Sequence, residues 1–125
     1  LVPGPDIELL AEPRYMQRAL QNLVGNACRY GKSQVVICLW DEPCLVRIDV
    51  EDDGPGIPFD ARADIFKPFA RLDDSRARSS GGYGLGLSIV QKIMAGHGGS
   101  VTVDSSPALG GARFTLLIPR RDSPV

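Results

Sequence analysis

The chain has 125 residues, 43% of them apolar, and a formal net charge of -1, which suits one globular domain with one core. Its 14 basic residues nearly balance its 15 acidic ones, so it lacks the basic excess typical of nucleic-acid-binding proteins. The longest apolar runs, such as residues 35–40, are well short of the ~18 residues that a membrane span needs. Its three cysteines form no CxxC pair and, with one histidine, no zinc signature, which favours a reduced, cytoplasmic setting.

The periodicity of the apolar residues predicts an α/β chain. Helices are indicated where apolar residues recur at three- and four-residue spacing, and strands where β-branched residues cluster between turn residues. In chain order, we expect a short strand over 6–12, a helix over 14–30, an antiparallel pair of strands over 35–40 and 45–51, a short helix over 59–65, a mobile polar loop over 67–83, a helix over 85–95 and strands over 100–105 and 112–118.

The first motif, NLVGNACRYG over residues 22–31, lies inside the first long predicted helix. Asn22 and Asn26 are one turn apart, with Arg29 and Tyr30 a turn further, so these polar side chains share one side of the helix. An amide oxygen suits Mg²⁺, which takes its other ligands from waters and substrate phosphates. Asn26 is therefore a candidate Mg²⁺ ligand and Arg29 a candidate phosphate contact, although both asparagines can equally be solvated helix residues.

The second motif, DDGPGI over residues 52–57, directly follows a predicted strand. A carboxylate fixed there can accept a hydrogen bond from the exocyclic amine of adenine, and the glycines remove bulk where a ring would lie. An ordinary Asp-Gly turn is the alternative for this motif in isolation.

The last two motifs are IFKPFARLD over residues 65–73 and GGYGLGL over residues 81–87. The second of these runs from the predicted loop into a helix start, where free backbone N–H groups and the positive end of the helix dipole favour phosphate. A flexible linker is the alternative. The chain has no GxGxxG sequence, and Gly31-Lys32-Ser33 lacks the first glycine of a P-loop, so neither of those nucleotide motifs is supported.

In this order the four motifs resemble the N, first glycine, F and second glycine boxes of the ATP-binding domain of bacterial two-component sensor histidine kinases, in the GHKL superfamily. The resemblance spans nearly the whole chain, so residues 1–125 are expected to be one catalytic domain without the dimerisation and phosphoacceptor segment. It implies the Bergerat fold, a two-layer α/β sandwich with a mixed, mostly antiparallel sheet, about three helices on one face and ATP held under a lid. The closing glycine box is matched by residues 110–114, although Ala112 stands where a small hydroxyl residue is common.

The resemblance also implies a set of site residues and ligands. The expected ligands are ATP and Mg²⁺, with Asn26 on the metal and Asp53 as the acceptor for adenine. The residues expected to bind ATP are Asn22, Asn26, Arg29, Tyr30, Asp53, Gly54, Gly56, Ile57, Lys67, Arg71, Gly82, Tyr83, Gly84, Leu85, Gly86 and Leu87.

Asn22 distinguishes a kinase from the ATPase relatives, which carry a Glu at this position to activate water. An amide cannot take a proton at neutral pH, so ATP is expected to be held for transfer. The family's acceptor is a histidine on a separate dimeric helical hairpin of the same protein, and His97, at a glycine-rich helix end, is expected to cap that end instead. The resemblance further implies a response regulator downstream, and a cytoplasmic domain of an inner-membrane sensor that is a homodimer when intact and a monomer as this fragment. It implies no nucleic-acid partner.

Two other classes of function remain open at this point. A nucleotide-gated binding module would close the loop over ATP and change a protein contact without transferring phosphate. A structural α/β sandwich without a ligand would require all four motifs to be coincidental.

Overall fold

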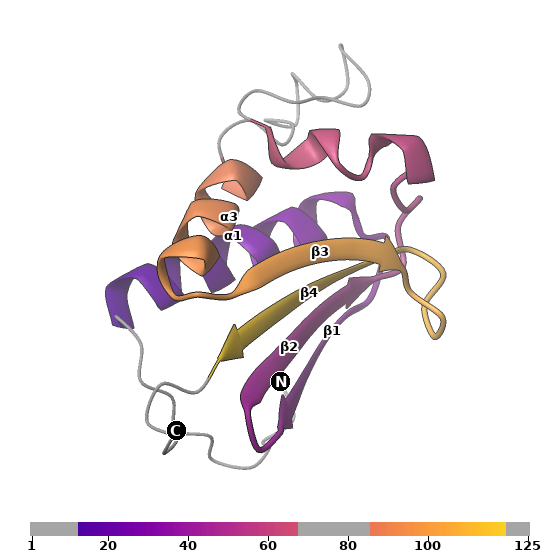
Figure 1. Ribbon diagram of the computed structural model, residues 1–125. Coiled ribbons are helices and arrows are strands. Elements are labelled where there is room, and N and C mark those ends of the chain that lie inside the picture. The colour runs from indigo at the N-terminus through magenta and orange to yellow at the C-terminus, as the bar shows by residue number, and fades with distance from the viewer. Residues whose placement is uncertain (1–12, 68–85, 120–125) are drawn as a thin grey trace.

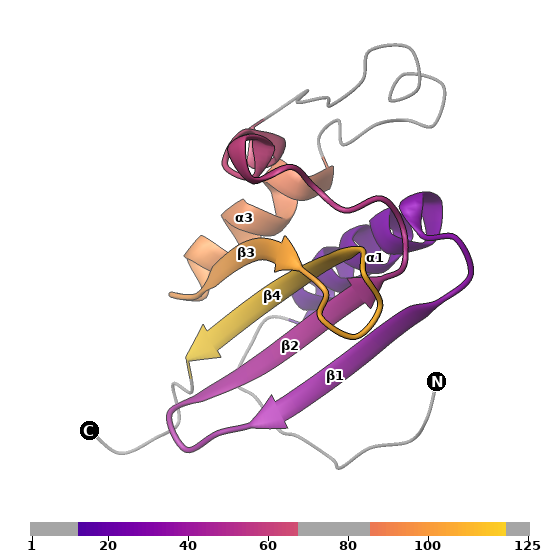
Figure 2. The same cartoon turned by 90° about the vertical axis from the view of Figure 1, so that its right-hand side faces the viewer.

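In the part of the chain that the structure describes, four strands form an open antiparallel sheet, and the helices cover one of its faces (Figures 1 and 2). The computed structural model describes residues 13–67 and 86–119. The strand order is β1-β2-β4-β3, and α1 packs against both α3 and β2. The elements are α1 (Pro13–Tyr30), β1 (Val35–Asp41), β2 (Leu45–Asp52), the 3₁₀ helices η1 (Phe59–Ala61) and η2 (Asp64–Phe66), α3 (Gly86–Gly96), β3 (Ser100–Ser105) and β4 (Ala112–Pro119).

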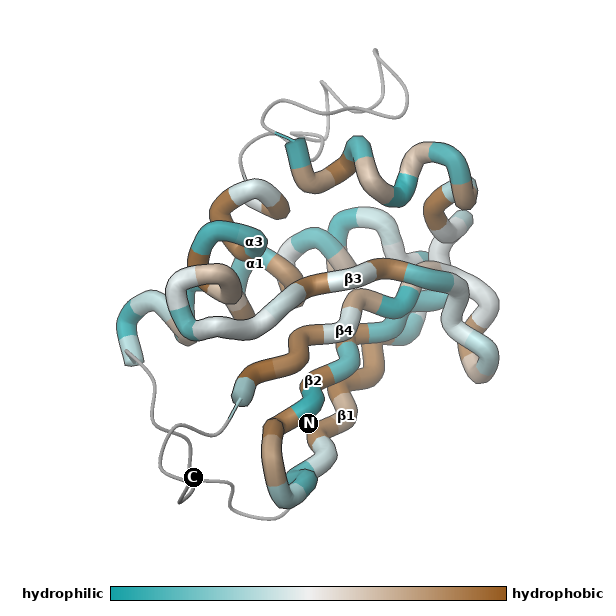
Figure 3. The backbone as a smooth tube through the Cα atoms, in the orientation of Figure 1, coloured by the Kyte–Doolittle hydropathy of each residue, from teal (hydrophilic) through white to brown (hydrophobic). Residues whose placement is uncertain are grey.

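The core lies between the helices and the sheet. Successive side chains of a strand point to opposite faces, so Val46, Ile48 and Val50 of β2 all face the helices and are buried. They pack in one cluster with Leu23 of α1 and Phe114 of β4. Figure 3 shows brown, hydrophobic stretches in the strands and in α3. The same alternation places Asp52, the last residue of β2, on the helix side of the sheet.

The other face of the sheet carries charged side chains bonded to one another. Asp49 of β2 is 0% exposed and accepts hydrogen bonds from Arg47 at 3.1 and 3.0 Å and from the Thr115 hydroxyl at 2.8 Å. Arg113 of β4 pairs with Asp104 of β3 through two bonds of 2.9 Å. A buried carboxylate is tolerated only with such partners, so this network holds three strands in register.

The predicted α/β sandwich is confirmed, and each strand pairing in the described ranges is antiparallel. Each predicted helix and strand within these ranges is found, with bounds that agree to within one residue, except near residues 59–65. There the short helix consists of two separate 3₁₀ turns. The predicted strand over residues 6–12 lies outside the described ranges, as does the predicted loop apart from Lys67. None of the described helices combines the length and the hydropathy needed to cross a membrane.

Candidate functional site

The residues of the first two motifs meet where α1 and β2 end (Figure 2). Val35, at the start of β1, pairs with Asp52 at the end of β2, so the turn after α1 lies beside the end of β2. Ser105 pairs with Ala112, which brings the loop between β3 and β4 to the same edge. Three loops far apart in sequence therefore surround one end of the sheet.

Asp52 is the buried carboxylate at this edge, with an exposed fraction of 2%. Its Oδ1 accepts hydrogen bonds from the backbone N–H groups of Gly54 at 2.9 Å and Ala112 at 3.3 Å. Gly111 packs so closely on Asp52 that an added Cβ would collide with both its backbone and its carboxylate, so only glycine fits there. The carboxylate is held in one orientation on the helix side of the sheet.

Asp53 has a different set of partners. Its carboxylate accepts hydrogen bonds from the backbone N–H of Lys32 at 2.7 Å, from the backbone N–H of Ser33 at 3.0 Å and from the Ser33 hydroxyl at 2.7 Å. The backbone bond from Ser33, followed by the bond from its hydroxyl, holds the pKa of Asp53 well below its usual range. Because the turn after α1 occupies both oxygens, the structure disfavours Asp53 as an adenine acceptor and favours Asp52.

The hydrogen bonds of Asp53 thus favour Asp52 over the predicted Asp53 as the acceptor, and the sequence held a signal for this choice. The buried residues 46, 48 and 50 of β2 alternate in phase with position 52 and out of phase with position 53. A count of this alternation from the apolar residues would have placed Asp52 on the helix side.

The polar side of α1 faces the start of α3. The Asn22 Oδ1 is 3.6 Å from the position that a Cβ on Gly86, the first residue of α3, would take. Asn26, one turn along α1, is 5% exposed. A Cβ added at Gly25, between them, would meet no atom within 4 Å. The start of a helix carries the positive end of the helix dipole, which favours an anion, so the Asn22 amide oxygen lies close to a helix end of this kind.

The remaining predicted site residues fall into three groups. Gly54 and Ile57 are buried, Gly56 has a φ of 78°, and Leu87 belongs to the core. Arg29 is exposed, Tyr30 is half-buried, and the exposed Lys67 pairs with Asp64 at 2.9 Å. The others lie outside the described residues: Arg71, Gly82, Tyr83, Gly84 and Leu85.

The prediction that His97 caps a helix end is confirmed. Its backbone N–H donates to the carbonyls of Ile93 at 3.2 Å and Met94 at 3.0 Å at the end of α3. Its Nδ1 lies 2.8 Å from the Ile93 carbonyl oxygen and donates to it in the Nδ1–H tautomer. The imidazole is therefore bonded within its own helix end.

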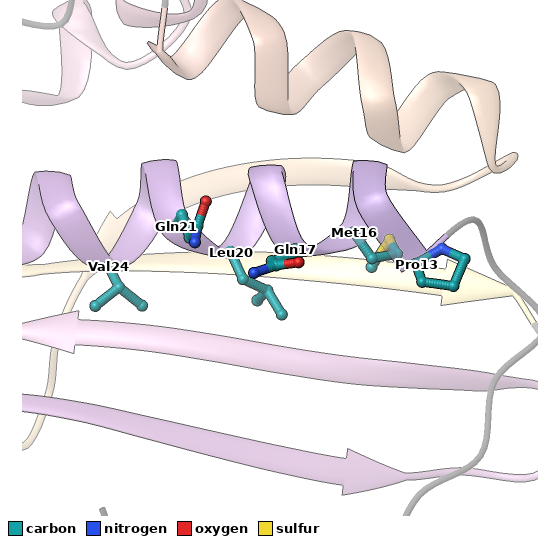
Figure 4. Close-up of a pocket in the computed structure, with 6 residues that line it drawn as sticks. All are labelled: Pro13, Met16, Gln17, Leu20, Gln21 and Val24. Atoms are coloured by element: carbon teal, nitrogen blue, oxygen red, sulfur yellow. The ribbon is translucent and has the colours of Figure 1, made fainter.

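A separate apolar groove of about 600 Å³ runs along α1. Figure 4 shows its lining side chains, which include Met16, Leu20 and Val24. At 100° per residue these positions lie on the opposite flank of α1 from Asn22 and Asn26. The groove offers few polar groups, so it does not belong to the site described above.

Comparison with known proteins identifies the class of protein. The model of the family described as "Histidine kinase-, DNA gyrase B-, and HSP90-like ATPase" matches residues 11–122, and the chain belongs to this family. The resemblance to sensor histidine kinase ATP-binding domains is thereby confirmed.

Individual relatives agree with this assignment. The Sensor protein RstB of Escherichia coli K12 is 51% identical over 106 residues, which are 85% of this chain and 24% of that protein. The ATP binding domain of PrrB from Mycobacterium tuberculosis superposes with a TM-score of 0.77 at 29% identity, over 97% of this chain and 78% of that one. The histidine kinase domain of the E. coli osmosensor EnvZ superposes with a TM-score of 0.67 at 38% identity, over 95% of this chain and 72% of that one. The chain spans about a quarter of the length of curated relatives such as RstB and CpxA.

Proposed function

We propose that this chain is the catalytic domain of a sensor histidine kinase, which binds MgATP and transfers the γ-phosphate to a histidine on a separate dimeric helical hairpin of its parent protein. The observation that carries the proposal is Asn22, an amide that faces the start of α3. A carboxylate at this place could activate water, whereas an amide has no basic atom at neutral pH. The γ-phosphate is therefore held for another acceptor.

The residues of the site fit a nucleotide that spans it. Asp52 accepts from the exocyclic amine of adenine, and its fixed Oδ1 orients the carboxylate for that bond. Gly54, Gly56 and Ile57 border the adenine. Asn26 offers a buried amide oxygen to Mg²⁺, while Asn22, Arg29, Tyr30 and Lys67 lie toward the phosphates, with Leu87 behind them in the core. Arg71 and residues 82–86 complete the proposed lid over the phosphates.

The proposed reaction is phosphoryl transfer in which the chain positions the substrate. When bound, Mg²⁺ neutralises charge on the phosphates. The bond between the γ-phosphorus and its bridging oxygen breaks, and ADP leaves with the electron pair. A bond forms between the phosphorus and an imidazole nitrogen, and the imidazole gives up its proton to water. The side chains on α1 and the N–H groups of α3 hold the phosphates in line for this exchange.

The parent protein supplies the other parts of the proposed system. We propose that it is a homodimeric inner-membrane sensor, that this domain lies in the cytoplasm, and that a response regulator takes the phosphate onward. The isolated chain should be monomeric. It should not phosphorylate itself, because its one histidine, His97, is hydrogen-bonded at the end of α3.

The test is phosphorylation in trans. The chain is mixed with the separate histidine-bearing hairpin of its own parent protein and labelled ATP, and acid-labile phosphate on the hairpin is measured. The reaction should be slow without the tether, which normally supplies an effective concentration in the mM range, and should rise with domain concentration. Asn26→Ala should abolish it through lost Mg²⁺, whereas Asp104→Asn, on the far face of the sheet, should not.

If nucleotide binds but no phosphohistidine forms at high domain concentration, the kinase proposal fails. A nucleotide-gated binding module is then the better account. Phosphate on the isolated chain that disappears in His97→Gln would instead show that the role given to His97 is wrong.

A further inference from the structure

Asp53 joins the two halves of the site. Its carboxylate belongs to the residue that follows β2, and the groups that donate to it belong to the turn that follows α1. One half of the site is Asp52, the residue before it. The other half is the last two turns of α1, which carry Asn26 and Arg29.

This carboxylate stands at an electrostatically unfavourable place. The C-terminal end of a helix carries partial negative charge, so an anion beside the 18-residue α1 is not stabilised by the helix dipole. Two backbone N–H groups and one hydroxyl converge on it instead, at 2.7 to 3.1 Å. A carboxylate, which only accepts, suits three donors better than an amide, whose NH₂ group would face one of them.

The backbone of Gly54 makes a second contact between the same two elements. An added Cβ on Gly54 would collide with the carbonyl of Tyr30, the last residue of α1. The carboxylate of Asp53 and the bare Cα of Gly54 therefore hold the end of α1 directly against the corner that follows β2.

We infer that Asp53 is a positioning residue, which fixes the distance between the adenine half and the phosphate half of the site and does not itself touch adenine. The inference rests on the proposed nucleotide site. A ligand that reaches both halves binds more tightly when their separation is fixed, because binding of one end of the ligand holds its other end at high effective concentration near the second half. A ligand that reaches only the adenine half gains nothing from it.

The two kinds of ligand give the test. Dissociation constants of adenosine, which reaches one half, and of MgADP and a non-hydrolysable MgATP analogue, which reach both, are measured calorimetrically for the 125-residue chain and its variants. Asp53→Asn should raise the dissociation constants of the two phosphate-bearing ligands about tenfold and that of adenosine less than about twofold. Asp104→Asn, which removes the same charge from an ion pair on the far face of the sheet, should leave the ratio of these constants unchanged.

Ser33→Ala provides a milder variant that keeps both backbone bonds to Asp53. It should raise the dissociation constant of MgADP about threefold. The double variant with Asp53→Asn and Ser33→Ala should have a dissociation constant within about twofold of that of Asp53→Asn alone, because both changes break the same interaction. If Asp53→Asn does not fold, the adenosine-to-MgADP ratio of Ser33→Ala carries the same test. A general loss of stability would lower the unfolding temperature without changing this ratio.

The outcomes separate this inference from the proposed function. If the wild-type chain binds neither adenosine nor MgADP, the nucleotide site fails and the role of Asp53 fails with it. If the wild-type chain binds both ligands, and the folded variants raise the two dissociation constants equally or leave them unchanged, only the positioning role is overturned.

Discussion

Replacement of Asp52 by Asn should weaken adenine nucleotide binding with little change in stability. The Asn side chain has the same size, and its carbonyl oxygen can take the place of Oδ1, which accepts from Gly54 and Ala112. Its NH₂ group then stands where the second oxygen stood and faces the adenine amine, so two donors meet. An unsatisfied buried donor costs about 1–3 kcal/mol, which is about five- to 150-fold in the dissociation constant.

The measurement is a calorimetric titration of MgADP into the wild type and the variant, with urea unfolding of both. Asp60→Asn is the matched control, because Asp60 is an exposed residue of η1 and the substitution removes the same charge. The reasoning is refuted if Asp52→Asn binds MgADP as tightly as the wild type does. A large loss of stability would also count against it, because the bonds to Oδ1 were expected to survive.

Three further predictions concern stability. Gly25→Ala should raise the free energy of unfolding by about 1 kcal/mol in urea titrations, since Ala favours a helix interior and its Cβ would meet nothing within 4 Å. Phe114→Ala should lower it by about 3–5 kcal/mol, because Phe114 is 0% exposed and meets Phe66 edge to face at 6.2 Å; an unchanged urea midpoint would contradict this. The pKa of Asp53 is lower in the folded state than in the unfolded state, where it is about 4. Its contribution to the free energy of unfolding is therefore complete above the unfolded pKa and is lost as the pH falls below that value. The stability difference between wild type and Asp53→Asn should therefore be constant above about pH 5 and shrink in more acidic urea titrations.

The secondary structure could be predicted because its signals are local. Apolar spacing in residues 14–30 and β-branched runs around the turn at 41–43 determine helix and strands regardless of what packs on them. The two 3₁₀ turns were not separable from a short helix, because 3₁₀ and α-helical turns use similar backbone angles. Only the second of these turns, η2, has residues buried in the core, Ile65 and Phe66.

Tertiary contacts account for what the sequence did not reveal. In an alternating strand, Asp49 would be expected to face solvent. Its burial is explained by the bonds that it accepts from Arg47 of the same strand and from Thr115 of β4, which is distant in sequence. Similarly, the donors of Lys32 and Ser33 lie about twenty residues before Asp53, and nothing local in the second motif points to them. Such polar contacts depend on which loops meet at the sheet edge.

The neighbouring acids, Asp52 and Asp53, provide a comparison within one site. Their side chains leave the end of β2 in different directions, one among backbone donors on the helix side and one toward the turn after α1. If Asp52 contacts adenine, Asp52→Asn should weaken adenosine and MgADP by the same factor, because both ligands carry the amine. If Asp53 only positions the halves, Asp53→Asn should weaken MgADP far more than adenosine. Exchange of these two patterns between the variants would restore Asp53 as the adenine acceptor and make Asp52 the structural residue.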